Sequence, residues 1–172
     1  MKILWVKSDF LHPTTKGGHI RTLEMLRRLH KRHEVHYVAF NDAREPEGLA
    51  RSVEYSFRAY PVQHDVPPRR SLKFLRQLIE GVWSPLPVSI NRYRSAQMTS
   101  VIQELLRAQR FDAVVCDFLT PAVNFDDHAD VVLFQHNVES VIWERHASTA
   151  ANPPTTKSIQ PIAKNCSTAI QA

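Results

Sequence analysis

The chain has 172 residues, enough for one domain with a substantial core. Hydrophobic residues make up 43% and charged residues 23%, which excludes a wholly disordered chain, and two cysteines are too few for a disulfide-rich miniprotein. The net charge of +5 is clustered, at 27–32 and 69–76, and such clusters can meet anionic partners but more often form a solvated helix face. No zinc-finger spacing or aromatic-basic RNA motif accompanies them, which argues against nucleic acid. No apolar run is long enough to cross a bilayer and no signal peptide is recognisable, which predicts a cytoplasmic protein.

Taken in chain order, strand-like and helix-like segments alternate. Apolar, β-prone runs predict strands over 2–7, 33–40, 56–60, 111–117 and 131–134. Apolar residues at helical spacing predict helices over about 18–32, 46–53, 72–83, 94–109 and 138–146. The third strand is expected to stop before Pro61, and Cys116 reads as a small core residue. The alternation predicts an α/β fold, a Rossmann-like parallel sheet with helices on both faces.

One of these helices has a clear inward face. The residues of the helix over 94–109 that are expected to point to the core are Met98, Val101, Ile102, Leu105 and Leu106. The last 25 residues differ in composition from the rest: they contain no aromatic residue, no acidic residue and three prolines. We therefore expect a domain over 1–147 and a disordered low-complexity tail over 148–172.

A glycine pair occupies the loop between the first strand and the first helix. Gly17 and Gly18 are two of only four glycines in the chain. Glycines at this place let the backbone approach a ligand, and a helix N-terminus favours phosphate. The alternative is a tight turn that requires positive φ, and spacing does not decide between the two. The loop matches neither the Walker phosphate loop nor the dinucleotide fingerprint.

Polar residues also follow the last apolar strand, in the sequence Gln135-His136-Asn137-Val138-Glu139. Helix capping explains Asn137 and Glu139 but not His136, which could bind a phosphate or hydroxyl or move a proton. In a parallel sheet, ligands bind beyond the carboxyl ends of the strands, where both loops lie. No metal-binding motif is present, so no metal is expected.

The glycine loop with His19, together with the Phe134–Glu139 segment, resembles the N-terminal domain of the family 4 glycosyltransferases. The resemblance covers about residues 2–147. It implies one half of the two-domain GT-B architecture, in which the N-terminal domain mainly holds the acceptor and the C-terminal domain mainly holds the nucleotide-sugar. Transfer in the family proceeds with retention of anomeric configuration and generally without a metal, and the nucleotide-sugar is a co-substrate, so no cofactor is expected.

The resemblance also implies roles for individual residues. Gly17 and Gly18 would approach the donor diphosphate, and His136 would act at the reacting centre as the catalytic residue. His19, Asn137 and Glu139 would belong to the acceptor cleft. The expected partners are a nucleotide-sugar, a sugar or lipid-linked acceptor of envelope or polysaccharide synthesis, a donor-domain chain, and the inner face of the membrane as a peripheral contact.

The sequence departs from the family pattern because it contains no donor-binding domain, so the family's basic pair and Glu-x7-Glu motif are missing. The expectation is an acceptor-binding half with little or no activity alone, consistent with a truncated or frameshifted gene product. Three alternatives stay open: a two-chain enzyme, a non-catalytic sugar- or phosphate-binding module, and an unrelated nucleotide-binding Rossmann domain.

Overall fold

A computed structural model describes residues 1–63, 88–125 and 130–135. The strands are β1 (Lys2–Val6), β2 (Glu34–Asn41), β3 (Arg58–Gln63), β4 (Ala113–Asp117) and β5 (Val132–Phe134). The helices are α1 (Gly17–His30), α2 (Pro46–Ala50), α4 (Val88–Asn91) and α5 (Ala96–Ala108), with short 3-10 turns η1 (Ser52–Glu54) and η2 (Pro121–Asn124). By internal contacts the chain divides into 1–134 and 135–172, and the fold described below is that of the first unit.

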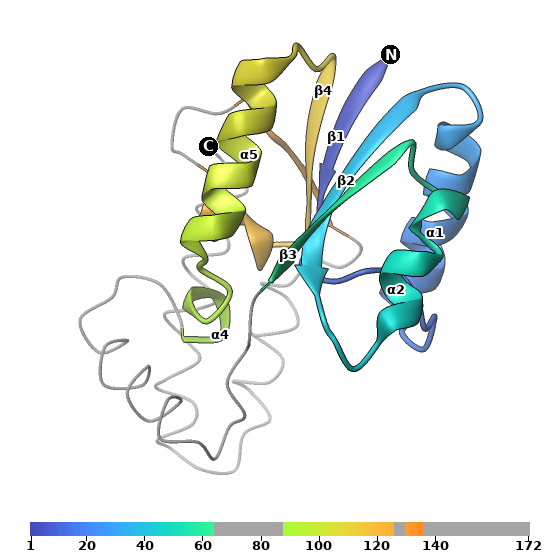
Figure 1. Cartoon of the computed structure of the whole chain (residues 1–172), viewed down its shortest axis with the longest axis horizontal. Coiled ribbons are helices and arrows are strands. Elements are labelled where there is room, and N and C mark those ends of the chain that lie inside the picture. The colour runs from blue at the N-terminus through green and yellow to red at the C-terminus, as the bar shows by residue number, and fades with distance from the viewer. Residues whose placement is uncertain (64–87, 126–129, 136–172) are drawn as a thin grey trace, which may run out of the picture. The chain divides into compact units, whose positions relative to one another are not determined.

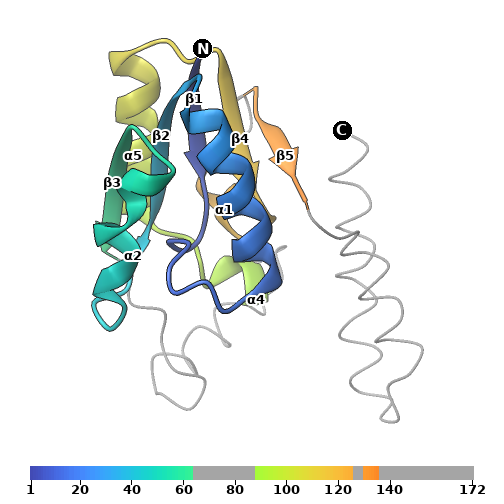
Figure 2. The ribbon, with the colours of Figure 1, turned by 90° about the vertical axis from the view of Figure 1, so that its right-hand side faces the viewer.

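The five strands form one parallel sheet in the order β3-β2-β1-β4-β5. The predicted Rossmann-like α/β class is therefore confirmed. The helix α1 and the short helix α2 lie on one face of the sheet, and α5 lies on the other (Figures 1 and 2). The predicted helices over 72–83 and 138–146 and the predicted tail over 148–172 fall outside the described residues.

Successive side chains along each strand point to opposite faces of the sheet, so the core has one part on each face. In β1, Ile3 and Trp5 pack with α1 while Leu4 and Val6 pack with α5. The same alternation in β2 sends Tyr37 to the α1 face and Val38 to the α5 face. Both central strands are therefore buried on both sides, as expected of a parallel sheet that carries helices on each face.

Two predictions about the edges of the sheet are wrong. The strand β3 does not stop before Pro61 but continues through it, because β3 is an edge strand and can lose a backbone N–H on its open side. At the other edge, Val132 of β5 is 60% exposed, although its apolar sequence suggested burial. Cys116, in contrast, is buried as predicted, and burial with the nearby carboxylate of Asp117 raises the pKa of its thiol to about 12.

The helix α5 begins at Ala96, and the Ser95 hydroxyl caps it by accepting a hydrogen bond from the Met98 N–H. Of its predicted inward residues, Met98, Ile102 and Leu105 are buried and Val101 is partly buried. Leu106 is the exception, with 37% of its surface exposed. It lies one position beyond the buried stripe, where the helix turns toward solvent.

The contrast between two residues of α5 provides a test of this core. Ile102→Ala should lower the free energy of unfolding by about 2–5 kcal/mol, because it leaves a cavity against β1 and β2. Leu106→Ala, the matched control on the same helix, should change it by less than about 0.5 kcal/mol. Urea unfolding of the two variants measures both values, and equal losses would contradict the described orientation of α5.

Candidate functional site at the carboxyl edge of the sheet

The chain leaves the carboxyl ends of the neighbouring strands β1 and β4 toward opposite faces of the sheet. After β1 it reaches α1 on one face, and after β4 it enters η2, which packs against α5 on the other. The side chain of Asn124 fixes η2 there, since its Oδ1 accepts from the Ser95 N–H at 2.7 Å and its amide donates to the Tyr93 carbonyl at 3.0 Å. Such a divergence is a topological switch point, the usual position of ligand sites in open α/β sheets.

A buried carboxylate, Asp117 at the end of β4, lies at this switch point. Its Oδ2 accepts hydrogen bonds from the Trp5 indole at 3.1 Å and from the Thr22 hydroxyl at 2.9 Å. The Lys7 ammonium forms an ion pair with the same oxygen at 3.0 Å, and both charged side chains are almost fully buried. One carboxylate therefore joins β4 to β1 and α1, whose bonded residues lie at least 95 residues earlier in the sequence.

The residue after Asp117 has an unusual backbone conformation. Phe118 has φ of 76°, in the left-handed region that a bulky residue rarely adopts. Its N–H donates to the Phe134 carbonyl of β5 at 2.9 Å, and the Lys7 ammonium lies 4.6 Å from the centre of its ring. The hydroxyls of Ser8 and Thr120 then join the two loops by a hydrogen bond. Strain of this kind persists only where surrounding contacts fix it, and it concentrates at functional sites.

A second group of charges lies in the loop between β1 and α1. Asp9 accepts a hydrogen bond from the Lys16 ammonium at 2.8 Å and from His19 Nε2 at 2.9 Å. Burial by itself would raise the pKa of Asp9, but the hydrogen bonds and positive charge of His19 and Lys16 outweigh it and hold the pKa at about 2. Asp9 is therefore ionised at neutral pH, and Lys16, two-thirds exposed, presents a cation at the opening of α1.

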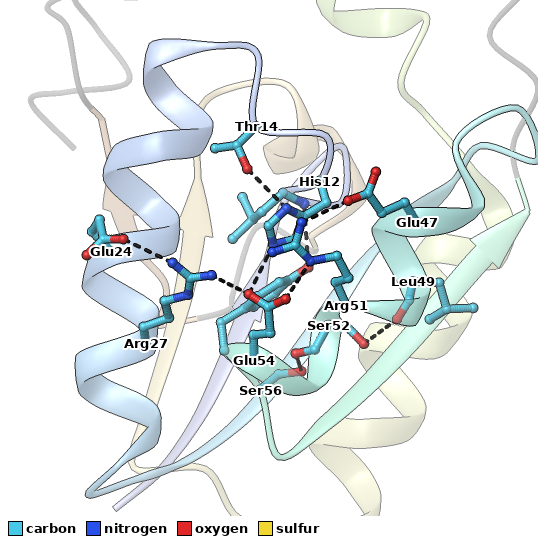
Figure 3. A network of polar contacts seen from close by, with 12 residues as sticks. His12, Thr14, Glu24, Arg27, Glu47, Leu49, Arg51, Ser52, Glu54 and Ser56 are labelled. Atoms are coloured by element: carbon cyan, nitrogen blue, oxygen red, sulfur yellow. Dashed lines mark hydrogen bonds and ion pairs between the residues drawn. The ribbon is translucent and has the colours of Figure 1, made fainter.

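A network of polar contacts, drawn in Figure 3, connects this loop to the neighbouring elements. The buried ring of His12 hydrogen-bonds the Thr14 hydroxyl through Nδ1 and lies with its Nε2 3.5 Å from the Glu54 carboxylate. Glu54 also accepts from the guanidinium groups of Arg27 and Arg51, which hold its pKa at about 2. The network thus ties the loop to η1 and to α1.

Two further contacts make the loop rigid. Tyr37 donates its hydroxyl to the Asp9 carbonyl at 2.9 Å, and the adjacent Phe10 and Leu11 are buried in the core. The helix α2 approaches so closely that a Cβ placed on Gly48 would stand 2.9 Å from the His12 carbonyl oxygen and 2.8 Å from Phe10 Cβ. The loop therefore presents its polar residues from a fixed backbone.

The glycine pair opens α1 directly after this loop, and its backbone excludes one of the two explanations left open by the sequence. None of the described glycines has positive φ, so Gly17 and Gly18 are ordinary helical residues and the tight-turn explanation is excluded. A Cβ placed on Gly17 would meet no atom of the described residues within 4 Å. The helix has no side-chain cap and no acidic residue in its first turn, and the carboxylate of Asp9 beside it is bound by Lys16 and His19.

Of the site residues predicted from sequence, the structure brings together the three at the start of α1. Gly17 and Gly18 form the first helical positions, and His19 follows with its ring buried and held by Asp9. The other three predicted residues, His136, Asn137 and Glu139, lie outside the described residues, so their predicted place beside the glycine pair is not tested.

Sequence reasoning missed the charged residues that organise this edge, namely Lys7, Asp9, Glu54 and Asp117. Two of them had a visible signal, because Lys7 and Asp117 each end an apolar strand with a charge at the carboxyl edge. Their pairing was not visible, since it depends on β1 and β4 being neighbours across 110 residues of sequence. Glu54 gave no signal beyond that of an ordinary surface acid.

Comparisons of the chain with protein-family models, with curated proteins and with solved structures found no match. Within residues 1–63, 88–125 and 130–135, no three His, Cys, Asp or Glu side chains gather as metal ligands. In the same part of the chain, no helix combines the length and apolar character that crossing a bilayer requires.

Removing the charge at the switch point should destabilise the fold strongly. Asp117→Asn leaves the Lys7 ammonium buried without its counter-charge, and we expect a loss of about 3–5 kcal/mol in the free energy of unfolding. Asp42→Asn, which breaks the exposed pair with Arg44, should cost less than about 1 kcal/mol. Urea unfolding of both variants checks this, and similar small losses would show that the switch point does not depend on Asp117.

Proposed function

We propose that the chain is the acceptor-side half of a retaining glycosyltransferase of the GT-B type, which acts on a nucleotide-sugar and a sugar or lipid-linked acceptor and is inactive without a donor-binding half. The order and parallel direction of the strands support this proposal, as does the position of the glycine pair at the carboxyl end of β1. The residue roles that it assigns are diphosphate contact for Gly17 and Gly18 and action at the reacting centre for His136.

The observation that carries the proposal is that the fold does not require glycine at position 17. The φ angle of Gly17 is not positive, and an added Cβ would meet nothing within 4 Å in the part of the chain that the structure describes. Glycine also offers no side chain with which to cap or stabilise the first turn of α1, where Gly17 is the first residue. A glycine that the backbone does not require, beside open space, is explained if a ligand occupies that space.

The charges around this position suit a diphosphate. The uncapped N-terminus of α1 offers backbone N–H groups and the positive end of the helix dipole. Lys16 adds a cation next to them, balanced by Asp9. In sugar transfer, negative charge develops on the leaving diphosphate, and preorganised donors of this kind stabilise it without reorganisation. The rigid loop described above supplies that preorganisation.

Two glycine variants separate this role from a structural one. Gly17→Ala should leave the thermal midpoint unchanged or slightly higher, because alanine favours the helix, while in the chain joined to a matching donor domain it weakens binding of UDP or GDP by about tenfold or more. Gly48→Ala, the control, should lower the midpoint by several degrees, because its Cβ collides with the His12 carbonyl. Calorimetric titration and thermal unfolding measure both effects.

The outcomes of that experiment are distinct. Binding of both nucleotides that is unaffected by Gly17→Ala would contradict the role of the glycine pair. Tight binding of NAD, with no binding of UDP or GDP, would favour the alternative of an unrelated dinucleotide-binding domain.

His136 is tested in a transfer assay, after the chain has been joined to or mixed with a matching donor domain. His136→Ala should lower the rate of transfer by about two orders of magnitude, as is typical for a positioned polar group at a reacting centre. His33→Ala, at a histidine away from the carboxyl edge, serves as the control and should leave the rate unchanged. Full activity of His136→Ala would refute the assignment of the catalytic residue.

A further inference from the structure

The loop between β1 and α1 contains a histidine, His12, whose ring is enclosed in the protein. Only 2% of His12 is exposed, and its Nδ1 lies 3.0 Å from the Thr14 hydroxyl. The ring stands against that of Tyr55, with 6.2 Å between their centres, and the His12 carbonyl faces α2 at Gly48. The Tyr55 hydroxyl is itself uncharged, because burial raises its pKa. The His12 ring therefore cannot reach solvent unless the loop moves away from α2 and η1.

The hydrogen bonds of this ring suit its neutral form. A neutral imidazole carries one N–H, and with that proton on Nδ1 the Thr14 hydroxyl accepts it. A protonated ring must carry a second N–H on Nε2, a buried atom that makes no hydrogen bond in the part of the chain that the structure describes. The Glu54 carboxylate lies 3.5 Å from Nε2, beyond the usual length of an N–H···O bond. Protonation of His12 would thus bury a donor without an acceptor, which is costly.

The charges around the ring pair with one another and not with His12 (Figure 3). The charged groups that face it come from α2 and its end, from η1 and from α1: Glu47, Arg51, Glu54 and Arg27. Arg51 pairs with Glu47 at 2.8 Å and with Glu54 at 2.5 Å. Arg27 pairs with Glu54 as well. Burial of the ring, and next the positive charge of Arg51, lower the pKa of His12, and the two carboxylates oppose this shift without outweighing it.

Two other buried histidines differ from His12 in this respect. The ring Nε2 of His19 lies 2.9 Å from Asp9 Oδ2, and that of His36 lies 2.8 Å from Glu34 Oε1. Each of these rings therefore has a carboxylate at hydrogen-bond distance that accepts an N–H. His12 is the one of the three without such a carboxylate, so a proton added to its ring disturbs the contacts around it.

We propose that protonation of His12 in mild acid releases the β1–α1 loop from α2 and η1 and thereby makes the site at the start of α1 sensitive to pH. In the released loop the ring lies in water and accepts a proton freely, whereas the closed loop disfavours the charged form. A histidine whose pKa in the folded protein is below its ordinary value of 6.5 stabilises the closed loop fully above that pH. This stabilisation is lost as the pH falls below 6.5 toward the lower pKa of the buried ring.

The release of the loop has a consequence for ligand binding. The loop carries Asp9 and Lys16 and leads directly into Gly17, so its movement would separate the groups that would contact a diphosphate. The effect on binding rests on the proposed function, whereas the release itself is a property of the fold. The two are therefore measured separately.

Hydrogen exchange of the full chain from about pH 7.5 to about pH 5.5, corrected for the intrinsic effect of pH on exchange, tests the release. We expect the protection of the loop to fall by up to about tenfold for each pH unit below 6.5, the limit for one proton, while α5 keeps its protection. His12→Asn does not titrate but keeps a polar atom near the position of Nδ1, so its loop protection should not change with pH. His33→Asn, the matched control beyond the end of α1, should behave like the unaltered chain.

A second measurement needs no variant: in the unaltered chain, the NMR signal of the His12 ring should titrate with a pKa below 6.5. A ring that titrates at or above 6.5, loop protection that does not change with pH, or the same pH dependence in His12→Asn would each overturn the proposal. In the chain joined to a matching donor domain, UDP binding that stays constant while the loop is released would overturn the link to the glycine site. Loop release with no UDP binding at any pH would contradict the proposed function and still support the role of His12.

Discussion

The arrangement of this domain depends on one buried ion pair, between Lys7 and Asp117. Burying a carboxylate is costly unless its oxygens are paired and hydrogen-bonded, so Asp117 requires the indole of Trp5, the hydroxyl of Thr22 and the ammonium of Lys7 all to be in place. Trp5 and Lys7 lie at the end of β1 and Thr22 lies in α1, all at least 95 residues before Asp117 in the sequence. These contacts with Asp117 therefore hold α1 against the sheet and the end of β1 beside the end of β4. The glycine pair, at the start of α1, is positioned by the same contacts.

Most of the fold could be predicted from the sequence, because it follows from local patterns. Apolar runs mark the strands, and the spacing of Met98, Ile102 and Leu105 marks a helix face. The wrong predictions concern segments whose length or burial depends on their position within the sheet and not on their own composition. Pro61 is tolerated and Val132 is exposed because β3 and β5 are edge strands, and strand order cannot be read from a segment in isolation.

The candidate site was less predictable, because its geometry depends on pairs of residues far apart in the sequence. The glycine pair is visible as a motif, but only the φ angles show that it does not form a tight turn. The hydrogen bonds of Asp9 with His19 and Lys16 are local, yet the loop could have taken many shapes without the contacts from Tyr37 and Glu54. Side-chain contacts between distant elements therefore supply what the motif alone could not.

The proline in the edge strand has a consequence for how molecules of this protein meet each other. An open sheet edge is a template on which another chain can extend the hydrogen-bond ladder, the first step of edge-to-edge aggregation. Pro61 lies within β3 and has no N–H to offer on that edge, and Arg58 at the start of the strand is exposed and charged. An incoming strand would meet a gap in the ladder and a charge to desolvate. Pro61, because of which the sequence predicted an early end of β3, therefore protects this edge of the sheet from pairing with a strand of another molecule.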